Sequence, residues 1–213
     1  MRYRVGAVFK SPRTIRLAHE LGDLKNLKND STIFDFKAFG DPPEKYIVSF
    51  NGSTLVPTGG REKFPAHSID PKDVAVGDHQ EVEIILGAEY PRRGPQVRWL
   101  TPIVHSNIWG GGTVCLGNYS NAWTPYFRLV DMIEILWDMA RLAVLNPRSA
   151  GTGARNAEED WEKLYRKFQF PVDRRPLRDK VLGNNDGSSK MRPEGAEDDI
   201  AIIPDDGDNC PRE

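Results

Sequence analysis

The sequence predicts an α+β fold: an N-terminal helix, a four-stranded antiparallel meander, a cysteine-bearing loop and C-terminal helices. Apolar residues recur at helical spacing near the N-terminus and again in the second half of the chain. Between these regions lie short runs rich in aromatic and β-branched residues, broken by Pro, Gly and Asn corners. This order is typical of helices segregated about an antiparallel sheet.

Composition narrows the class of protein. A chain of 213 residues that is 38% apolar is long enough for one domain, expected over residues 1–170, with a C-terminal extension over 171–213. The net charge is −2 and the Lys and Arg residues are dispersed, which argues against a nucleic-acid partner. No apolar run approaches the length of a membrane span. The expected partner is another protein.

The first helix is expected over residues 12–28. Ser11-Pro12 is a start signal, and apolar residues follow at near-helical spacing: Ile15, Ala18, Leu21, Leu24 and Leu27. Basic side chains, among them Arg13 and Arg16, lie between these apolar positions. The helix should therefore be amphipathic.

The strands come next. Residues 31–56 predict two strands and the start of a third, separated by Gly40-Asp-Pro-Pro43 and Asn51-Gly52. Residues 81–86 and 96–100, on either side of a Pro- and Gly-rich corner, complete the four-stranded meander.

Two helices should follow the sheet. Apolar residues from Leu129 to Ala143 predict a central helix with a broad apolar face. A final helix is expected over 154–168, ending before Pro171. From Gly183 the chain has nine acidic residues, three basic residues and no aromatic residue, so we expect this acidic segment to be mobile.

One short segment combines an imidazole, a side-chain amide and a thiol: His105, Asn107 and Cys115. The run Tyr90-Pro-Arg-Arg-Gly-Pro95 precedes it, and Trp123-Thr-Pro125 follows it. Together these parts resemble the ubiquitin-conjugating enzymes, in which a Tyr-Pro corner, a His-Pro-Asn tripeptide, a catalytic Cys eight residues after the Asn, and Trp-x-Pro occur in this order. The resemblance covers roughly residues 12–168 and implies the fold of that family.

The resemblance also implies a chemistry. Cys115 would receive a ubiquitin-like modifier as a thioester from an activating enzyme and offer it to a lysine of a target protein. Asn107 would stabilise the oxyanion that forms when the amine attacks, or order the loop. His105 is interpreted as a residue that bonds the backbone of the turn rather than as a general base. No cofactor or metal is implied.

Several positions depart from the family pattern. Ser106 replaces the proline of His-Pro-Asn, and Gly94 replaces the first proline of a Pro-Pro pair. The acidic residue that many relatives carry after an Asn-Pro pair is absent after Asn146-Pro147, where Ser149 is the nearest substitute. The ligase-contact positions fall at Arg92, Pro125 and Tyr126, and the charged Arg92 makes a conventional RING-type ligase doubtful.

Other partner contacts follow from the resemblance. Arg13 and Arg16 on the first helix either dock the activating enzyme or form a solvated face. The divergent stretch 46–60 and the run Leu136-Trp-Asp-Met look like the bacterial branch of the family, whose members are encoded beside an activating enzyme and a ubiquitin-like protein, several of them acting in antiphage defence. The residue pattern itself adds one more candidate: Ile200, Ile202 and Ile203 form a short apolar run among acids, which either adds a strand to a ubiquitin-like protein or is part of an acidic tail without that role.

Alternatives remain open for the thiols and for the function. Both cysteines, Cys115 and Cys210, are expected to be free in a reducing cytosol. A module of the same fold that binds a ubiquitin-like protein without chemistry is one alternative. A cysteine hydrolase is another, but it needs a histidine base, and the other histidines of the chain stand in unremarkable sequence contexts: His19, His67 and His79. The triplet Gly110-Gly-Gly112 is interpreted as a turn, because it lacks the Gly-Lys-Ser/Thr of a phosphate loop.

Overall fold

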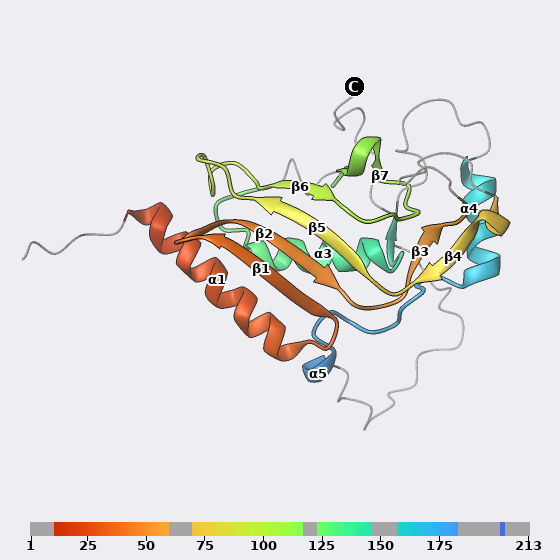
Figure 1. The fold of residues 1–213 in the computed structure, drawn as a ribbon, viewed down its shortest axis with the longest axis horizontal. Coiled ribbons are helices and arrows are strands. Elements are labelled where there is room, and N and C mark those ends of the chain that lie inside the picture. The colour runs from red at the N-terminus through yellow and green to blue at the C-terminus, as the bar shows by residue number, and fades with distance from the viewer. Residues whose placement is uncertain (1–10, 60–69, 117–122, 146–156, 183–200, 203–213) are drawn as a thin grey trace, which may run out of the picture.

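The computed structural model describes residues 11–59, 70–116, 123–145, 157–182 and 201–202 (Figure 1). Its main sheet has the strand order β1-β2-β5-β6-β8-β7. Four of these strands pair antiparallel with their neighbours as the predicted meander: β1 (Phe34–Gly40), β2 (Pro43–Phe50), β5 (Gln80–Ile85) and β6 (Gln96–Trp99). The predicted α+β fold is confirmed.

Helix α1 (Pro12–Asp30) begins where the sequence predicts and ends two residues later than expected. The Ser11 hydroxyl accepts a hydrogen bond from the Thr14 N–H, and Pro12 occupies the first helical position, where a missing N–H costs nothing. One face of the helix is buried and consists of Leu17, Glu20, Leu24 and Leu27. This face packs toward β1, β2 and the central helix.

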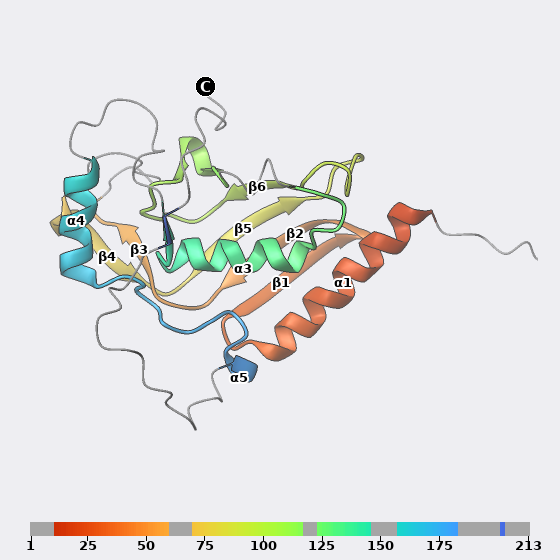
Figure 2. The same ribbon diagram turned by 180° about the vertical axis from the view of Figure 1, so that it is seen from behind.

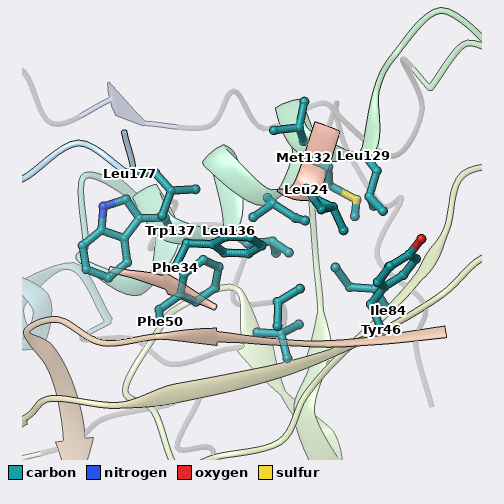
Figure 3. Close-up of a cluster of buried hydrophobic side chains, with 14 of the residues drawn as sticks. Leu24, Phe34, Tyr46, Phe50, Ile84, Leu129, Met132, Leu136, Trp137 and Leu177 are labelled. Carbon is teal, nitrogen blue, oxygen red and sulfur yellow. The ribbon is translucent and has the colours of Figure 1, made fainter. Parts of the chain in front are cut away.

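Helix α3 (Leu129–Ala140) crosses one face of the sheet (Figure 2). Its Leu136 and Trp137 are fully buried and meet Phe34 and Phe50 of the sheet in the core (Figure 3). The predicted helix ran to Ala143, but α3 ends at Ala140 because Leu142 adopts a left-handed backbone conformation with φ of 61°. A left-handed residue cannot continue a right-handed helix.

A second, smaller core lies at the other end of the sheet. Strands β3 (Thr54–Pro57) and β4 (Val74–Gly77) pair antiparallel. The short 3₁₀ helix η1 (Pro71–Asp73) directly precedes β4, and α4 (Ala157–Phe168) packs against it (Figure 1). Its buried side chains are Leu55, Val74, Val104, Leu142, Leu145, Trp161, Leu164 and Phe170. The left-handed Leu142 therefore contributes to this core.

The folded part continues beyond the predicted boundary at residue 170. Leu177 is buried beside Trp137 (Figure 3), whose indole N–H donates to the Arg175 carbonyl at 2.9 Å. Arg178 pairs with Asp30 and Glu134 at 2.8 Å each, just before α5 (Asp179–Leu182). Composition changes only at Gly183, and further bonds join residues 171–182 to the domain, among them the Thr32 N–H to the Asp179 carboxylate at 2.7 Å and the Ser53 N–H to the Asp173 carboxylate at 3.0 Å.

Candidate active site

The segment from Asn107 to Cys115 forms a hairpin at the edge of the sheet opposite β1. Strands β7 (Ile108–Trp109) and β8 (Thr113–Val114) pair antiparallel, with Ile108 opposite Val114. The Cys115 N–H donates to the Asn107 carbonyl at 2.8 Å, which continues this register by one residue. Directly opposite residues of such a pair have Cβ atoms about 4.5–5.5 Å apart. The eight-residue spacing in sequence thus places Asn107 and Cys115 directly opposite each other across the hairpin.

The hairpin turns through η2 (Gly110–Gly112). Gly111 and Gly112 have φ values of 69° and 95°, a region that residues with a Cβ rarely adopt. The glycine triplet therefore serves a tight turn that sets the register of the pair.

His105 anchors the start of the hairpin with both ring nitrogens. Its Nδ1 accepts from the Asn107 N–H at 3.0 Å, so Nε2 carries the proton that it donates to the Val144 carbonyl, also at 3.0 Å. The side chain is fully buried. Burial lowers the pKa of His105 to about 4, although the bond to Val144 opposes the shift. At neutral pH the ring is therefore uncharged, and both of its nitrogens are hydrogen-bonded to backbone groups.

Asn107 is held through its backbone and its side chain. It is 1% exposed, its N–H bonds His105 and its carbonyl bonds Cys115. The Ser106 hydroxyl donates to the Asn107 side-chain oxygen Oδ1 at 2.9 Å. An amide fixed in this way beside a thiol can stabilise negative charge on a carbonyl bonded to that sulfur.

Cys115 is 5% exposed and is disulfide-bonded in the structure. The expectation that both thiols are free is therefore wrong for Cys115, and the described part of the chain holds no free cysteine. The other cysteine of the sequence, Cys210, lies outside the described residues. Counting cysteines missed the bond because composition does not show which sulfur atoms the fold brings together.

The remaining parts of the motif support the corner before the hairpin. The Trp123 indole N–H donates to the Pro91 carbonyl at 2.8 Å, and the Trp123 ring lies 5.8 Å from the Tyr90 ring between centroids. A Cβ added at Gly94 would lie 3.2 Å from the Trp123 ring. Gly94 therefore allows the indole to lie close against the backbone, which gives a physical reason for glycine at this position.

Arg13 and Arg16 make contacts within the chain. Arg13 pairs with Glu44 and donates to the carbonyls of Leu86 and Gly87 at 3.2 and 3.1 Å. Arg16 pairs with Glu20 and donates to the carbonyls of Pro125 and Phe127 at 2.6 Å each. Both guanidinium groups hold α1 against neighbouring loops, with 29% and 21% of each side chain exposed.

The predicted ligase-contact positions are exposed. Tyr126 is 91% exposed, and the Arg92 side chain is 78% exposed with only a long 3.7 Å contact to Glu89. Pro125 is exposed, and its carbonyl accepts from Arg16. The loop that carries Pro125 and Tyr126 is thus fixed by its backbone and presents its side chains to solvent.

Several predicted residues lie outside the described part of the chain, namely Ser149, Ile200, Ile203 and His67. Ile202 belongs to β10 (Ala201–Ile202), which pairs parallel with β9 (Val144–Leu145) of the same chain. His19 is exposed on α1, and the exposed His79 bonds Asn51 at 2.9 Å. The imidazole in the Cys115 hairpin is His105, whose two nitrogens are occupied by the backbone.

Sequence reasoning missed two contributors, Glu20 and Val144. Glu20 is a buried carboxylate that accepts from the Tyr90 hydroxyl and from the Leu129 N–H at 3.0 Å. Its one signal in the sequence is an acidic residue three positions after Leu17 on the apolar face of the helix. Val144 contributes only a backbone carbonyl, which no side-chain pattern can reveal.

Within the described ranges, no group of His, Cys, Asp and Glu is arranged to hold a metal ion. The helices of those ranges include none with the length and apolarity of a membrane span.

A family model and individual related proteins point to the same family. The model of the family "Ubiquitin-conjugating enzyme" matches residues 77–174. The chain is similar to ubiquitin-conjugating enzyme E2-23 kDa of Triticum aestivum, with 32% identity over 127 residues, which is 55% of this chain and 69% of that protein. It is also similar to ubiquitin-conjugating enzyme E2 13 of Saccharomyces cerevisiae, with 32% identity over 99 residues and 41% of this chain.

The fold comparison agrees. A putative ubiquitin conjugating enzyme from Plasmodium yoelii superposes with a TM-score of 0.51 and 20% identity, covering 77% of this chain and 95% of that one. For three of the curated relatives that it matches, the chain spans 63%, 55% and 59% of their length.

Proposed function

Because this chain belongs to the ubiquitin-conjugating enzyme family, we propose that Cys115 accepts a ubiquitin-like modifier from an activating enzyme and transfers it to a lysine of a target protein. The observation that carries this proposal is the cross-strand placement of Asn107 opposite Cys115, fixed by a 2.8 Å backbone hydrogen bond. Cys115 can act only after its disulfide has been reduced.

The proposed reaction has two acyl transfers. The Cys115 thiolate attacks the thioester carbonyl on the activating enzyme, whose own cysteine leaves as a thiolate. A lysine amine then attacks the Cys115 thioester, an amide bond forms, the Cys115 thiolate leaves, and the amine proton passes to solvent. In the second step the Asn107 amide donates to the oxyanion. His105 holds the turn, because its ring is neutral and both of its nitrogens are already bonded.

Discharge of the charged protein onto free lysine tests this role of Asn107. Reduced protein is charged with ubiquitin, a ubiquitin-activating enzyme and ATP, the charging is quenched, and loss of the thioester is followed after lysine is added. Asn107→Ala should slow discharge by about 10²–10³-fold. Asn26→Ala, an exposed asparagine on α1, should leave it unchanged. Equal rates for wild type and Asn107→Ala would remove Asn107 from the mechanism.

Orientation of the incoming lysine is assigned to Ser149. It follows Asn146-Pro147 at the place where many relatives carry an acidic residue. A hydroxyl can accept a hydrogen bond from an ammonium or amine but brings no charge. Ser149→Ala should therefore raise the lysine concentration needed for half-maximal discharge, and Ser149→Asp should lower it. No change in either variant would withdraw this assignment.

Partner contacts are proposed on two surfaces. The activating enzyme would meet α1 through the exposed parts of Arg13 and Arg16. A ligase or target would meet Arg92, Pro125 and Tyr126, and the exposure of Arg92 and Tyr126 supports this. Removing the exposed Tyr126 or Arg92 side chain should weaken binding of such a partner without altering intrinsic discharge to free lysine.

We also propose the cellular process in which the chain acts. The divergent stretch 46–60 and the run Leu136-Trp-Asp-Met support a place in the bacterial branch, in cytoplasmic conjugation that contributes to antiphage defence. Plating efficiency of phage on bacteria that carry the chain with its neighbouring genes tests it. Wild type should protect and Cys115→Ala should not; equal plating would reject the defence role.

The tail is proposed to contact the modifier by strand addition through Ile200, Ile202 and Ile203. The pairing of Ala201–Ile202 with β9 supports the competence of this segment to add a strand. Such binding would require release from β9. Deleting 183–213 should weaken binding of the modifier, and unchanged binding and transfer would end this proposal.

A non-catalytic module that binds a ubiquitin-like protein is the second candidate. The disulfide at Cys115 and the absent acidic residue after Asn146-Pro147 favour it. The two candidates separate on one point, since the module would bind the modifier but form no thioester after reduction.

A further inference from the structure

Ser106 departs from the family tripeptide and lies against the proposed oxyanion donor. It is fully buried, and its hydroxyl donates to Asn107 Oδ1 at 2.9 Å. We propose that Ser106 is a positioning residue, which sets the orientation of the Asn107 side-chain amide for the transfer step. This inference rests on the proposed function.

The backbone of Asn107 is already fixed without Ser106. Its N–H donates to His105 and its carbonyl accepts from the Cys115 N–H. These two bonds act on the backbone and not on the side-chain amide, whose oxygen and nitrogen have nearly the same shape. The Ser106 hydroxyl contacts the amide itself, at its oxygen.

The Ser106 hydroxyl favours one orientation of the Asn107 amide through the hydrogen bond that its proton makes. Inside the protein the proton needs an acceptor, and the Asn107 oxygen is that acceptor. Turning the amide by 180° would let its NH₂ group donate to the hydroxyl oxygen, but the hydroxyl proton would then need another acceptor inside the protein. An unsatisfied buried donor costs about 1–3 kcal/mol. The hydroxyl thus keeps the oxygen toward Ser106 and the NH₂ group turned away from it.

Serine and proline act differently at this position. A proline fixes φ and has neither an N–H nor a hydroxyl. With serine, backbone stiffness is replaced by a side-chain hydrogen bond that acts on the amide itself. The role is specific to this chain's own tripeptide, His105-Ser106-Asn107.

A double-mutant cycle tests the proposal with the full, reduced chain. Ser106→Ala should slow discharge of the Cys115 thioester onto free lysine about 3- to 10-fold, the loss of one modest hydrogen bond. The lysine concentration for half-maximal rate and the rate of charging should not change. In the Asn107→Ala background, Ser106→Ala should have no further effect. Ser49→Ala, a partly exposed serine on β2, is the matched control.

The results that overturn the proposal are specific. An equal slowing by Ser106→Ala in the Asn107→Ala background would show that the hydroxyl acts on something other than this amide. An equal loss of charging and discharge would show a general disturbance of the hairpin.

A second readout does not depend on conjugation. In protein labelled with ¹⁵N-asparagine, the Asn107 side-chain NH₂ signal is identified by its loss in Asn107→Ala. Ser106→Ala should shift this signal and split or broaden it as a second orientation becomes populated. An unchanged signal would contradict the proposal even if the chain forms no thioester, whereas a changed signal with no thioester would count against the proposed function alone.

Discussion

His105 shows how single residues build this site. The side chain contributes neither charge nor proton transfer at neutral pH, because burial keeps the imidazole neutral and backbone groups occupy both nitrogens. Its two bonds join the Asn107 backbone to Val144, two positions far apart in sequence. Asn107 is thereby fixed from one side by His105 and from the other by Cys115.

Acidification should destabilise the fold through His105. Its pKa is about 4 in the folded chain against 6.5 for an ordinary histidine, so the unfolded chain binds more protons between these values. Stability is therefore fully present above pH 6.5 and is lost as the pH falls toward 4, by roughly 2 kcal/mol at pH 5. Urea unfolding at pH 7.5 and pH 5 measures this loss.

His105→Asn supplies the control for that measurement. The asparagine oxygen can still accept from the Asn107 N–H, but the side chain does not titrate. The variant should be less stable at pH 7.5 and should lose less stability on going to pH 5. A fall of the same size in wild type and His105→Asn would show that another group titrates.

At the scale of elements, Glu20 ties helix α1 to two other parts of the fold. Its carboxylate accepts from the Tyr90 hydroxyl, from the Leu129 N–H at the start of α3, and from Arg16. Burial, and then Glu20, raises the pKa of Tyr90, so the phenol stays a donor. A carboxylate at the N-terminus of α3 also meets the positive end of the helix dipole. One side chain thus connects α1, the Tyr-Pro corner and α3.

Glu20→Ala should lower the free energy of unfolding by about 3–5 kcal/mol, because it leaves the buried donors of this network without their acceptor. Asp23→Ala, on the same helix, removes only a 3.7 Å contact with Arg128 and should cost less than about 1 kcal/mol. Urea denaturation of both variants measures the difference. Similar costs would show that Glu20 is not the connecting residue.

Elements with strong local signals were predictable from the sequence. Ser11-Pro12 and the spacing of leucines gave α1 within two residues, and alternation with corner residues gave the meander. The early end of α3 was not predictable, since the left-handed Leu142 is stabilised by a core that forms from distant residues. Strands of two residues, β9 and β10, carry no readable pattern.

The sequence singled out candidate site residues but not the bonds that connect them. Spacing and resemblance singled out Asn107 and Cys115, while the register that places them opposite each other depends on the left-handed glycines of the turn. The Ser106 hydroxyl bond and the carbonyl of Val144 are consequences of tertiary structure. Sequence periodicity contains no information about either.

At the scale of the whole molecule, strand β9 contacts both the candidate site and the C-terminal segment. Val144 of β9 accepts from His105 and also lies opposite Ala201 of β10. Cys115 is disulfide-bonded, and the one other cysteine of the sequence, Cys210, follows β10 by eight residues. We therefore predict that the disulfide joins Cys115 to Cys210.

Cys210→Ser should accordingly leave Cys115 as a thiol without any reductant. A maleimide reagent should label the folded wild type only after treatment with a dithiol, which reduces the disulfide by thiol exchange and is itself oxidised to a cyclic disulfide. The variant should be labelled once before such treatment. Labelling of untreated wild type, or no labelling of untreated Cys210→Ser, would contradict an intrachain bond between these residues.

The most direct test of the central claim is thioester formation on Cys115. Reduced protein is mixed with ubiquitin, a ubiquitin-activating enzyme and ATP, and compared on non-reducing and reducing gels with Cys115→Ala and with Cys210→Ala as the matched control. Wild type and Cys210→Ala should form an adduct that a thiol reagent destroys, and Cys115→Ala should form none. No adduct on the reduced wild type, while a yeast conjugating enzyme is charged in a parallel reaction, would contradict the account.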